Sequence, residues 1–256
     1  LSAVIPILFT TRSRVFGARL RRACRKPVET IILPPMQSSP PHAIVIGGSG
    51  GIGTAMVDEL AKADWRVSAP SRAELDITVR DEVFAYFEGK SPELLVCAAG
   101  ATDDSLIARM TPEQWNQVWN VNYRGVCHCA EAVLPAMRNR GSGHIVFLSS
   151  QSAVHPPAGQ APYASAKAAL LDLTRDLAFR CGPQNIRVNA ILPGFLETRM
   201  TSGVSAARRQ EVLGDHALGR FNTCAAVAGF IRHLHESMPH TSGQIFQLDS
   251  RVNFSR

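Results

Sequence analysis

A tyrosine and a lysine lie four positions apart in the segment "PYASAK", which spans residues 162 to 167. Residues at positions i and i+4 share one face of an α-helix, so the side chains of Tyr163 and Lys167 are expected to project together. A cation beside a phenol favours the phenolate and lowers the pKa of the phenol from its reference value of about 10. Such a pair can exchange a proton with a substrate, although on its own it also fits a solvated helix face.

Three further segments favour proton transfer. Ser150 follows an apolar run that predicts a strand, and active-site groups of open α/β sheets gather at the carboxyl ends of strands. Asn122, in "NVNYRG", is an amide within a predicted helix that could hold a water chain behind Lys167. "LPGFLET" (residues 192–198) breaks a strand at a Pro-Gly pair and presents Thr198 to a cofactor. Taken singly, the serine also fits a turn cap and the asparagine a locally bonded helix amide.

The pattern of apolar residues predicts the scaffold that positions these groups. From residue 43 onward, short apolar runs alternate with amphipathic stretches of helical length, which indicates a parallel sheet covered by helices on both faces. We therefore expect a single-domain α/β, doubly wound Rossmann fold with a mostly parallel sheet. The expected strands are 43–48, 65–70, 93–100, 144–150, 186–194 and 243–249, and the expected helices are 53–63, about 112–139 and 162–180.

The connection after the second expected strand is short. Only residues 71–73 separate that strand from "ELDIT" (residues 74–78), whereas a helical crossover between parallel strands needs about a dozen residues or more. The usual helix is therefore expected to be missing, and the strand near Leu75 to Ile77 to be rudimentary or absent.

A glycine-rich turn directly follows the first expected strand and directly precedes a helix. In "IGGSGGIG" (residues 46–53) the glycines allow a tight turn, close approach of a pyrophosphate and packing of the helix against the strand. A glycine pattern alone is weak evidence, but the order strand, turn, helix and second strand makes a dinucleotide site specific.

The end of the second strand indicates which dinucleotide binds. An NAD-selective site usually carries an acid about 20 residues after the first glycine. Here the segment is "APSR", with Ser71 and Arg72 and no acid. A guanidinium can bind a 2′-phosphate through charge-assisted hydrogen bonds, so NADP(H) is favoured over NAD(H). The alternative is a solvated surface arginine.

Residues 43 to 250 resemble the short-chain dehydrogenase/reductase (SDR) family. The resemblance rests on the glycine motif, a serine thirteen residues before the tyrosine, the YxxxK pattern, and a Pro-Gly pair followed by threonine. "ALGRFNT" (217–223) and "TSGQIFQLD" (241–249) resemble the branch that includes the 3-oxoacyl-acyl-carrier-protein reductases.

The resemblance implies an NADP(H)-dependent oxidoreductase that transfers a hydride between nicotinamide and a carbonyl or secondary alcohol, such as a 3-oxoacyl thioester or another ketone. It assigns proton exchange to Tyr163, bonding of the substrate oxygen to Ser150, ribose binding and lowering of the phenol pKa to Lys167, and the proton relay to Asn122. The cofactor contacts it implies are Gly47, Ser49, Gly51, Ile52, Gly53, Ser71, Arg72, Asp76, Ile77, Ala99, Gly100, Tyr163, Lys167, Pro193, Gly194, Leu196 and Thr198. Among these, Asp76 would contact the adenine, the Leu196 backbone the carboxamide and Thr198 the pyrophosphate region.

The chain departs from the family pattern at three places. Ile46 stands where a threonine usually precedes the first glycine, and "CAAG" replaces NNAG with Cys97 and Ala98. Because both ends of one polar contact are lost together, we interpret this as apolar repacking that leaves no orphaned polar group. The short connection with "AELDIT" resembles the sugar-nucleotide branch.

Two alternative functions remain open. A sugar-nucleotide epimerase or dehydratase uses the same Tyr and Lys, but the close Gly51-x-Gly53 spacing and the absence of a large C-terminal domain argue against it. A non-catalytic dinucleotide-sensing protein would be expected to have lost the Tyr, Lys or Ser.

The net positive charge of the 256-residue chain lies entirely in its first residues. Of the net charge of +6, residues 1–35 account for all, with seven basic residues and one acidic residue, so the remainder is neutral. A neutral body argues against a nucleic-acid-binding domain. Residues 1–40 are expected to be a disordered basic extension, an artefact of start-site choice given Met36, or a targeting segment. The catalytic domain is expected to span residues 41–256.

Partners and location follow from the remaining features. Six cysteines without a CxxC pair favour neither a metal site nor disulfides and fit a reducing cytoplasm. No apolar stretch is long enough to predict a membrane span. The helix at 162–180 is apolar around most of its circumference, which predicts a homo-oligomer, a dimer or a tetramer. Residues 199–218, which include Arg208 and Arg209, are the expected substrate lid.

Overall fold

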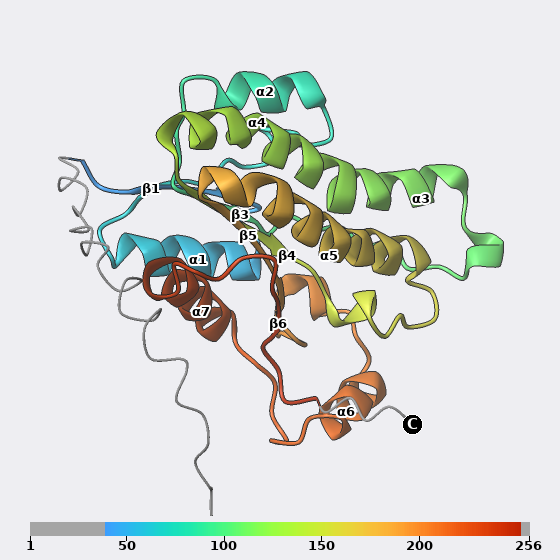
Figure 1. Cartoon of the computed structure of the whole chain (residues 1–256). Coiled ribbons are helices and arrows are strands. Elements are labelled where there is room, and N and C mark those ends of the chain that lie inside the picture. The colour runs from blue at the N-terminus through green and yellow to red at the C-terminus, as the bar shows by residue number, and fades with distance from the viewer. Residues whose placement is uncertain (1–38, 252–256) are drawn as a thin grey trace, which may run out of the picture. The chain divides into compact units, whose positions relative to one another are not determined.

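The computed structural model describes residues 39–251 of the chain. Nearly all of the basic segment 1–40, and the predictions made for it, lie outside the described residues. Within the described part, a central parallel sheet is covered by helices on both faces (Figure 1). No helix among the described residues is long and apolar enough to cross a membrane.

The sheet has six strands in the order β2-β1-β3-β4-β5-β6, and every pair is parallel. Chain order therefore reverses between β1 and β3, and open α/β sheets bind ligands at such a switch point. The central strands are almost wholly apolar because both of their faces are covered. The strands are β1 (His42–Ile46), β2 (Arg66–Ser68), β3 (Leu94–Cys97), β4 (Gly143–Leu148), β5 (Ile186–Leu192) and β6 (Ile245–Gln247).

Two apolar clusters hold helices against opposite faces of the sheet. Successive side chains of a strand point to opposite faces, so Ala43 and Val45 join the cluster under α1 and α7, whereas Ile44 and Ile46 join the cluster under α2, α4 and α5. The helices are α1 (Gly51–Ala61), α2 (Arg80–Phe87), α3 (Pro112–Trp119), α4 (Gly125–Arg140), α5 (Ala161–Cys181), α6 (Ala206–Gly214) and α7 (Cys224–Ser237). A π-helical turn, Asn120–Arg124, joins α3 to α4, and short 3-10 turns span Ile107–Arg109, Gln151–Ala153, Gly182–Gln184 and Arg199–Thr201. The predicted α/β Rossmann-type fold is confirmed.

The shortened connection after β2 is confirmed as well. Between Ser68 and Arg80 the chain forms turns, and β2 is the edge strand of the described sheet. Leu75 and Ile77 are nevertheless buried, and Ile77 packs against Gly125 at the start of α4. The segment from Leu75 to Ile77, expected to be a rudimentary or absent strand, therefore packs its apolar side chains beside the helices.

The two substituted family positions face each other. Ile46 and Cys97 are directly paired in the register of β1 and β3 and are 2% and 1% exposed. Both side chains belong to the apolar cluster under α2, α4 and α5, as the expected apolar repacking requires.

Three histidines of the described chain are held in their neutral form. Burial is the largest cause that lowers the pKa of His42 and of His235 to about 4, and it lowers the pKa of His144 well below its usual value. The His235 ring stacks on His144 and meets the edge of Trp65, with ring centres 5.5 and 5.0 Å apart. Because the unfolded chain binds these protons at higher pH, their contribution to stability is complete above about pH 6.5 and is lost as the pH falls toward 4.

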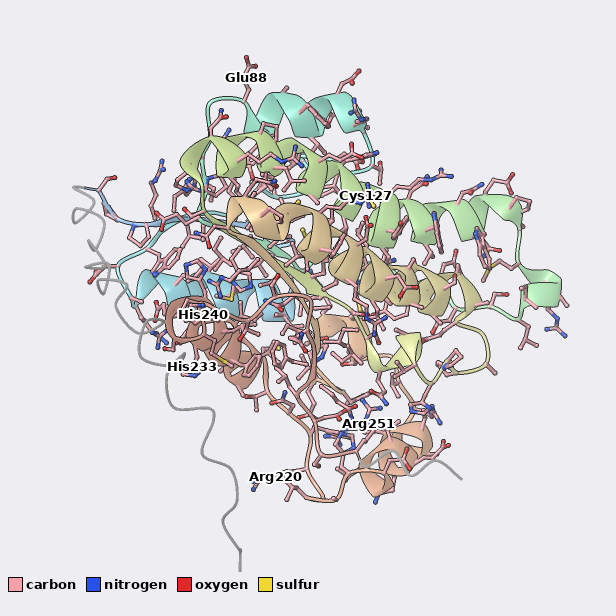
Figure 2. The ribbon with its side chains drawn as sticks, viewed as in Figure 1. Glu88, Cys127, Arg220, His233, His240 and Arg251 are labelled. Carbon is pink, nitrogen blue, oxygen red and sulfur yellow. The ribbon has the colours of Figure 1, made fainter. Side chains whose placement is uncertain are left out.

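We predict that His235→Phe, which keeps a ring in this stack, reduces the pH dependence of the unfolding free energy between pH 6.5 and 4. The slope of the unfolding free energy against pH should fall by up to about 1.4 kcal/mol per pH unit, which is the contribution of one proton that the unfolded chain binds and the folded chain does not. Urea denaturation at pH 7, 5.5 and 4.5 measures it. His233→Phe is the matched control, because His233 is exposed on the same helix (Figure 2). An unchanged slope in His235→Phe would contradict the assignment.

Candidate active site

A cleft of about 2160 Å³ opens at the carboxyl ends of the strands, over the switch point between β1 and β3. Most of the predicted site residues line it, including Ser150, Tyr163 and Lys167. The exceptions are Gly53, Ser71 and Asn122, which lie behind the lining. Among the described residues there is no group of three or more His, Cys, Asp or Glu side chains that could hold a metal ion.

The glycine turn leaves room for a phosphate at the start of α1. Gly47 has a φ of +83°, and a Cβ there would lie 2.6 Å from the backbone nitrogen of Ala99. A Cβ on Gly53 would collide with the carbonyl oxygen of Gly47, so α1 packs tightly on the turn. The first turn of α1 carries no acidic side chain, and its free N–H groups favour an anion.

The opposite wall comes from the loop after β5. A Cβ on Gly51 would lie 2.6 Å from Cγ2 of Thr198, so the threonine packs directly against the glycine turn. Thr198 begins the 3-10 turn Arg199–Thr201, and the Thr201 hydroxyl donates to the Leu196 carbonyl at 2.6 Å. Gly194 bends this loop with a φ of +86°. These contacts fix the loop that was expected to meet the nicotinamide end of a dinucleotide.

Arg72 stands at the far end of the cleft with 78% of its side chain exposed. Its guanidinium lies 3.9 Å from Asp76. The hydroxyl and backbone N–H of Thr78 donate to Asp76 and are the largest causes that lower the pKa of its carboxyl. A nearby acid, Glu74, turns back to accept from the Ser71 N–H at 2.7 Å and is not part of the cleft lining. The exposed positive charge at this end is therefore Arg72.

Tyr163 and Lys167 share one face of α5 as their spacing predicts. Lys167 is 3% exposed, its Nζ donates to the carbonyl of Leu148 at 2.8 Å, and Nζ lies 5.7 Å from the centre of the Tyr163 ring. The Ser149 hydroxyl donates to the carbonyl of Lys167 at 2.8 Å. Two reciprocal hydrogen bonds therefore fix α5 to the end of β4.

The pKa of Tyr163 moves in the direction opposite to our expectation. Burial raises the pKa of the phenol, a hydrogen bond with Ser150 opposes the rise, and the Asp104 carboxylate adds to it. Burial also lowers the pKa of Lys167 to about 8. The predicted lowering of the phenol pKa is therefore not seen in this structure, in which loss of solvent is the largest cause that shifts the pKa of Tyr163.

Ser150 fits both interpretations that its sequence position allows, a turn cap and an active-site serine. It caps the 3-10 turn Gln151–Ala153, with its Oγ accepting from the Ser152 N–H at 3.1 Å, and it also lines the cleft beside Tyr163. One lone pair of Oγ is thus occupied, and the hydroxyl proton remains available to the cleft.

Asn122 lies behind the cleft, in the π-helical turn between α3 and α4. Its Nδ2 donates to the carbonyls of Ala101 and Val118 at 2.7 and 2.8 Å. Its Oδ1 is buried without a partner in the part of the chain that the structure describes. An ideal Cβ on Gly100 would lie 3.2 Å from this Oδ1 and 3.9 Å from Nζ of Lys167. Both atoms therefore border the same small space, which suits a bridging water.

The expected lid forms one end of the cleft. Arg199, Met200 and Arg208 contribute to the lining, and α6 lies within this segment. The Phe221 ring packs on Phe195 and on His216, with ring centres 4.6 and 5.3 Å apart. Aromatic contacts therefore anchor the end of the segment to the loop after β5.

Two groups of cleft residues escaped sequence analysis. The first is Arg251, whose Nε donates at 2.6 Å to the buried carboxylate of Asp249, which also accepts from Gln247 at 2.7 Å. Arg251 lines the cleft and pairs with His216 through an isolated bridge, close to α6 in Figure 2. The second is Asp104, which lines the cleft with Ser152 and Gln160. Polar residues just beyond two strand ends were the available signal.

Known proteins are similar to this chain in sequence and in fold. A model of the family described as Enoyl-(Acyl carrier protein) reductase matches residues 53–251. The 3-oxoacyl-(acyl-carrier-protein) reductase FabG of Thermotoga maritima is 34% identical over 209 residues, covering 78% of this chain and 85% of that protein. FabG of Escherichia coli is 30% identical over 215 residues, covering 75% and 88%.

Solved structures agree on the architecture. The crystal structure of gox2181 has a TM-score of 0.77 at 26% identity and covers 83% of this chain and 95% of its own. A structure of ElxO with NADP bound has a TM-score of 0.75 at 22% identity, covering 82% and 98%. With the family match, the curated relatives and the cleft at the switch point together, the chain belongs to the short-chain dehydrogenase/reductase family and is an NAD(P)-dependent enzyme that acts on carbonyl or secondary alcohol groups.

Proposed function

We propose that this protein is an NADP(H)-dependent ketone reductase, with 3-oxoacyl thioesters as the first substrates to test. The observation that carries the proposal is the pair formed by the half-buried Tyr163 and the buried Lys167 at the cleft into which the glycine turn and α1 face. The similarity to 3-oxoacyl-acyl-carrier-protein reductases supports the choice of thioester.

NADPH, when bound, supplies the hydride that reaches the carbonyl carbon. Tyr163 donates the proton to the carbonyl oxygen, and the Ser150 hydroxyl donates a hydrogen bond to the same atom. Lys167 holds the ribose with a charged ammonium, while Asn122 Oδ1 holds the water that returns a proton from behind Lys167. The phenol, whose pKa is raised by burial, is protonated at neutral pH, as a proton donor to the carbonyl oxygen must be.

The cofactor's phosphates are proposed to lie over the glycine turn. Thr198 packs directly on Gly51, so a side chain at position 51 would collide with it, and the first turn of α1 carries no competing acid. Arg72 is proposed to bind the 2′-phosphate, because it is a cation with free donors at the lip of the cleft. The NADP bound in the ElxO structure agrees with this choice.

The alternative functions receive less support. A dinucleotide sensor needs no proton donor, yet Ser150, Tyr163 and Lys167 all meet at the cleft. For a sugar-nucleotide epimerase or dehydratase, the described chain contains no added substrate domain beyond the α6 segment.

We also infer a cytoplasmic location from the free cysteines Cys97, Cys127, Cys129, Cys181 and Cys224.

We predict that Tyr163→Phe lowers kcat for NADPH-dependent reduction of acetoacetyl-CoA by at least about 100-fold, because the proton donor is removed. The dissociation constant for NADPH should stay within about twofold, since the ring remains. Steady-state kinetics and cofactor fluorescence measure the two. Tyr123→Phe is the matched control, as Tyr123 does not line the cleft. Full turnover by Tyr163→Phe would refute the role given to the phenol.

We predict that Arg72→Ala weakens NADPH binding roughly 10- to 100-fold, the loss of charge-assisted hydrogen bonds, and leaves NADH binding nearly unchanged. Titration of both cofactors tests this. Arg80→Ala is the control, because Arg80 is an exposed arginine that pairs with Glu131 away from the cleft. Equal losses for the two cofactors would contradict 2′-phosphate recognition.

A homo-oligomer is proposed to assemble through α5. Phe179 on this helix is 85% exposed, an unusual state for a large apolar side chain. We predict a mass of two or four times 27.7 kDa by light scattering at micromolar concentration, and a smaller species for Phe179→Glu. A monomer under these conditions would count against the interface.

A further inference from the structure

A chain of hydrogen bonds connects the loop after β3 to Ser150. Gln160 Nε2 donates to the carboxylate of Asp104 at 2.7 Å, and the Ser152 hydroxyl donates to Gln160 Oε1 at 3.0 Å. The backbone N–H of Ser152 then donates to Ser150 Oγ at 3.1 Å. All four residues line the cleft.

The two loops that carry this chain are also joined through their backbones. The N–H of Ser105, next to Asp104, donates to the carbonyl of Gly159 at 3.0 Å, next to Gln160. Gly159 adopts a φ of +87° there, and an ideal Cβ on it would lie 3.8 Å from the backbone of Ser105, an ordinary van der Waals distance. The Asp104–Gln160 contact is therefore one half of a two-point connection between segments that are 56 residues apart.

The carboxylate of Asp104 sets the direction of the two side-chain bonds in the chain. An ionised carboxylate can only accept, so Gln160 must present its amide N–H to Asp104 and its carbonyl oxygen to Ser152. Ser152 must then donate its hydroxyl proton, which holds this residue in the turn that aims its backbone N–H at Ser150. With one lone pair engaged, Ser150 directs its own proton toward Tyr163 and the cleft.

We propose that Asp104 is a positioning residue for carbonyl reduction, which acts through Gln160 and Ser152 to orient the hydroxyl of Ser150 toward the substrate oxygen. The proposal rests on the reductase function proposed above. The neighbouring acid, Asp103, makes a different contact, because its Oδ1 accepts from Gln114 at the start of α3 and it does not line the cleft.

A second effect of Asp104 separates its charge from its hydrogen bond. The carboxylate raises the pKa of Tyr163. Asp104→Asn keeps an oxygen that accepts from Gln160 but removes the charge. If Asp104 acts through its hydrogen bond, kcat at about pH 6.5 should stay within about threefold of wild type in this variant, against the larger loss in Asp104→Ala.

The test uses NADPH-dependent reduction of acetoacetyl-CoA by the full chain. Asp104→Ala and Gln160→Met should each lower kcat about tenfold, the loss of one ordered hydrogen bond in the transition state, and the double variant should lose no more than either alone. NADPH affinity should stay within twofold in all three. Asp103→Ala is the matched control and should keep wild-type kinetics.

The decisive comparison places Asp104→Ala in a Ser150→Ala background. Because Asp104 acts through Ser150, the second substitution should cost less than twofold there, against about tenfold in the wild-type background. Equal losses in both backgrounds, or a loss in Asp104→Asn as large as in Asp104→Ala, would overturn the inference while leaving the reductase function intact. A wild-type protein that reduces no ketone would overturn both.

Discussion

The site depends on the burial of one ammonium at the carboxyl end of β4. A buried charge is stable only where polar groups replace its water, and Lys167 finds the carbonyl of Leu148 at 2.8 Å. The Ser149 hydroxyl returns a bond to the Lys167 carbonyl, so the strand end and the second turn of α5 are held together. This contact places Tyr163 over the same strand end, beside Ser150. The order of strands then brings the glycine turn of β1 to the other side of the cleft.

Burial also decides the protonation states on which the chemistry depends. Loss of solvent raises the pKa of Tyr163 and lowers that of Lys167 to about 8, so the ammonium still carries most of its charge at neutral pH. Asp104 adds to the rise of the phenol pKa through its charge and, as proposed, orients Ser150 through Gln160. One short stretch of helix thus carries both the proposed proton donor and the proposed ribose-binding cation.

Features encoded in contiguous residues could be predicted from the sequence. The glycine turn follows from the backbone of Gly47, the shared face of α5 from an i, i+4 spacing, and the missing strand after β2 from a connection too short for a crossover. The Asp104–Gln160 contact could not be predicted, because its two residues are 56 positions apart and neither belongs to a family motif. The pKa of Tyr163 could not either, because spacing gives its neighbours but not its loss of solvent.

Transfer of deuterium tests the central claim most directly. Wild-type protein is incubated with acetoacetyl-CoA and NADPH deuterated on each face of nicotinamide C4 in turn, and the product is analysed by mass spectrometry. If Tyr163 and Lys167 serve a hydride-transfer site, one of the two labelled cofactors delivers deuterium to the carbinol carbon, and Tyr163→Phe abolishes the labelled product while still binding NADPH. Unlabelled product from both cofactors, or equal labelling by wild type and Tyr163→Phe, would contradict the account.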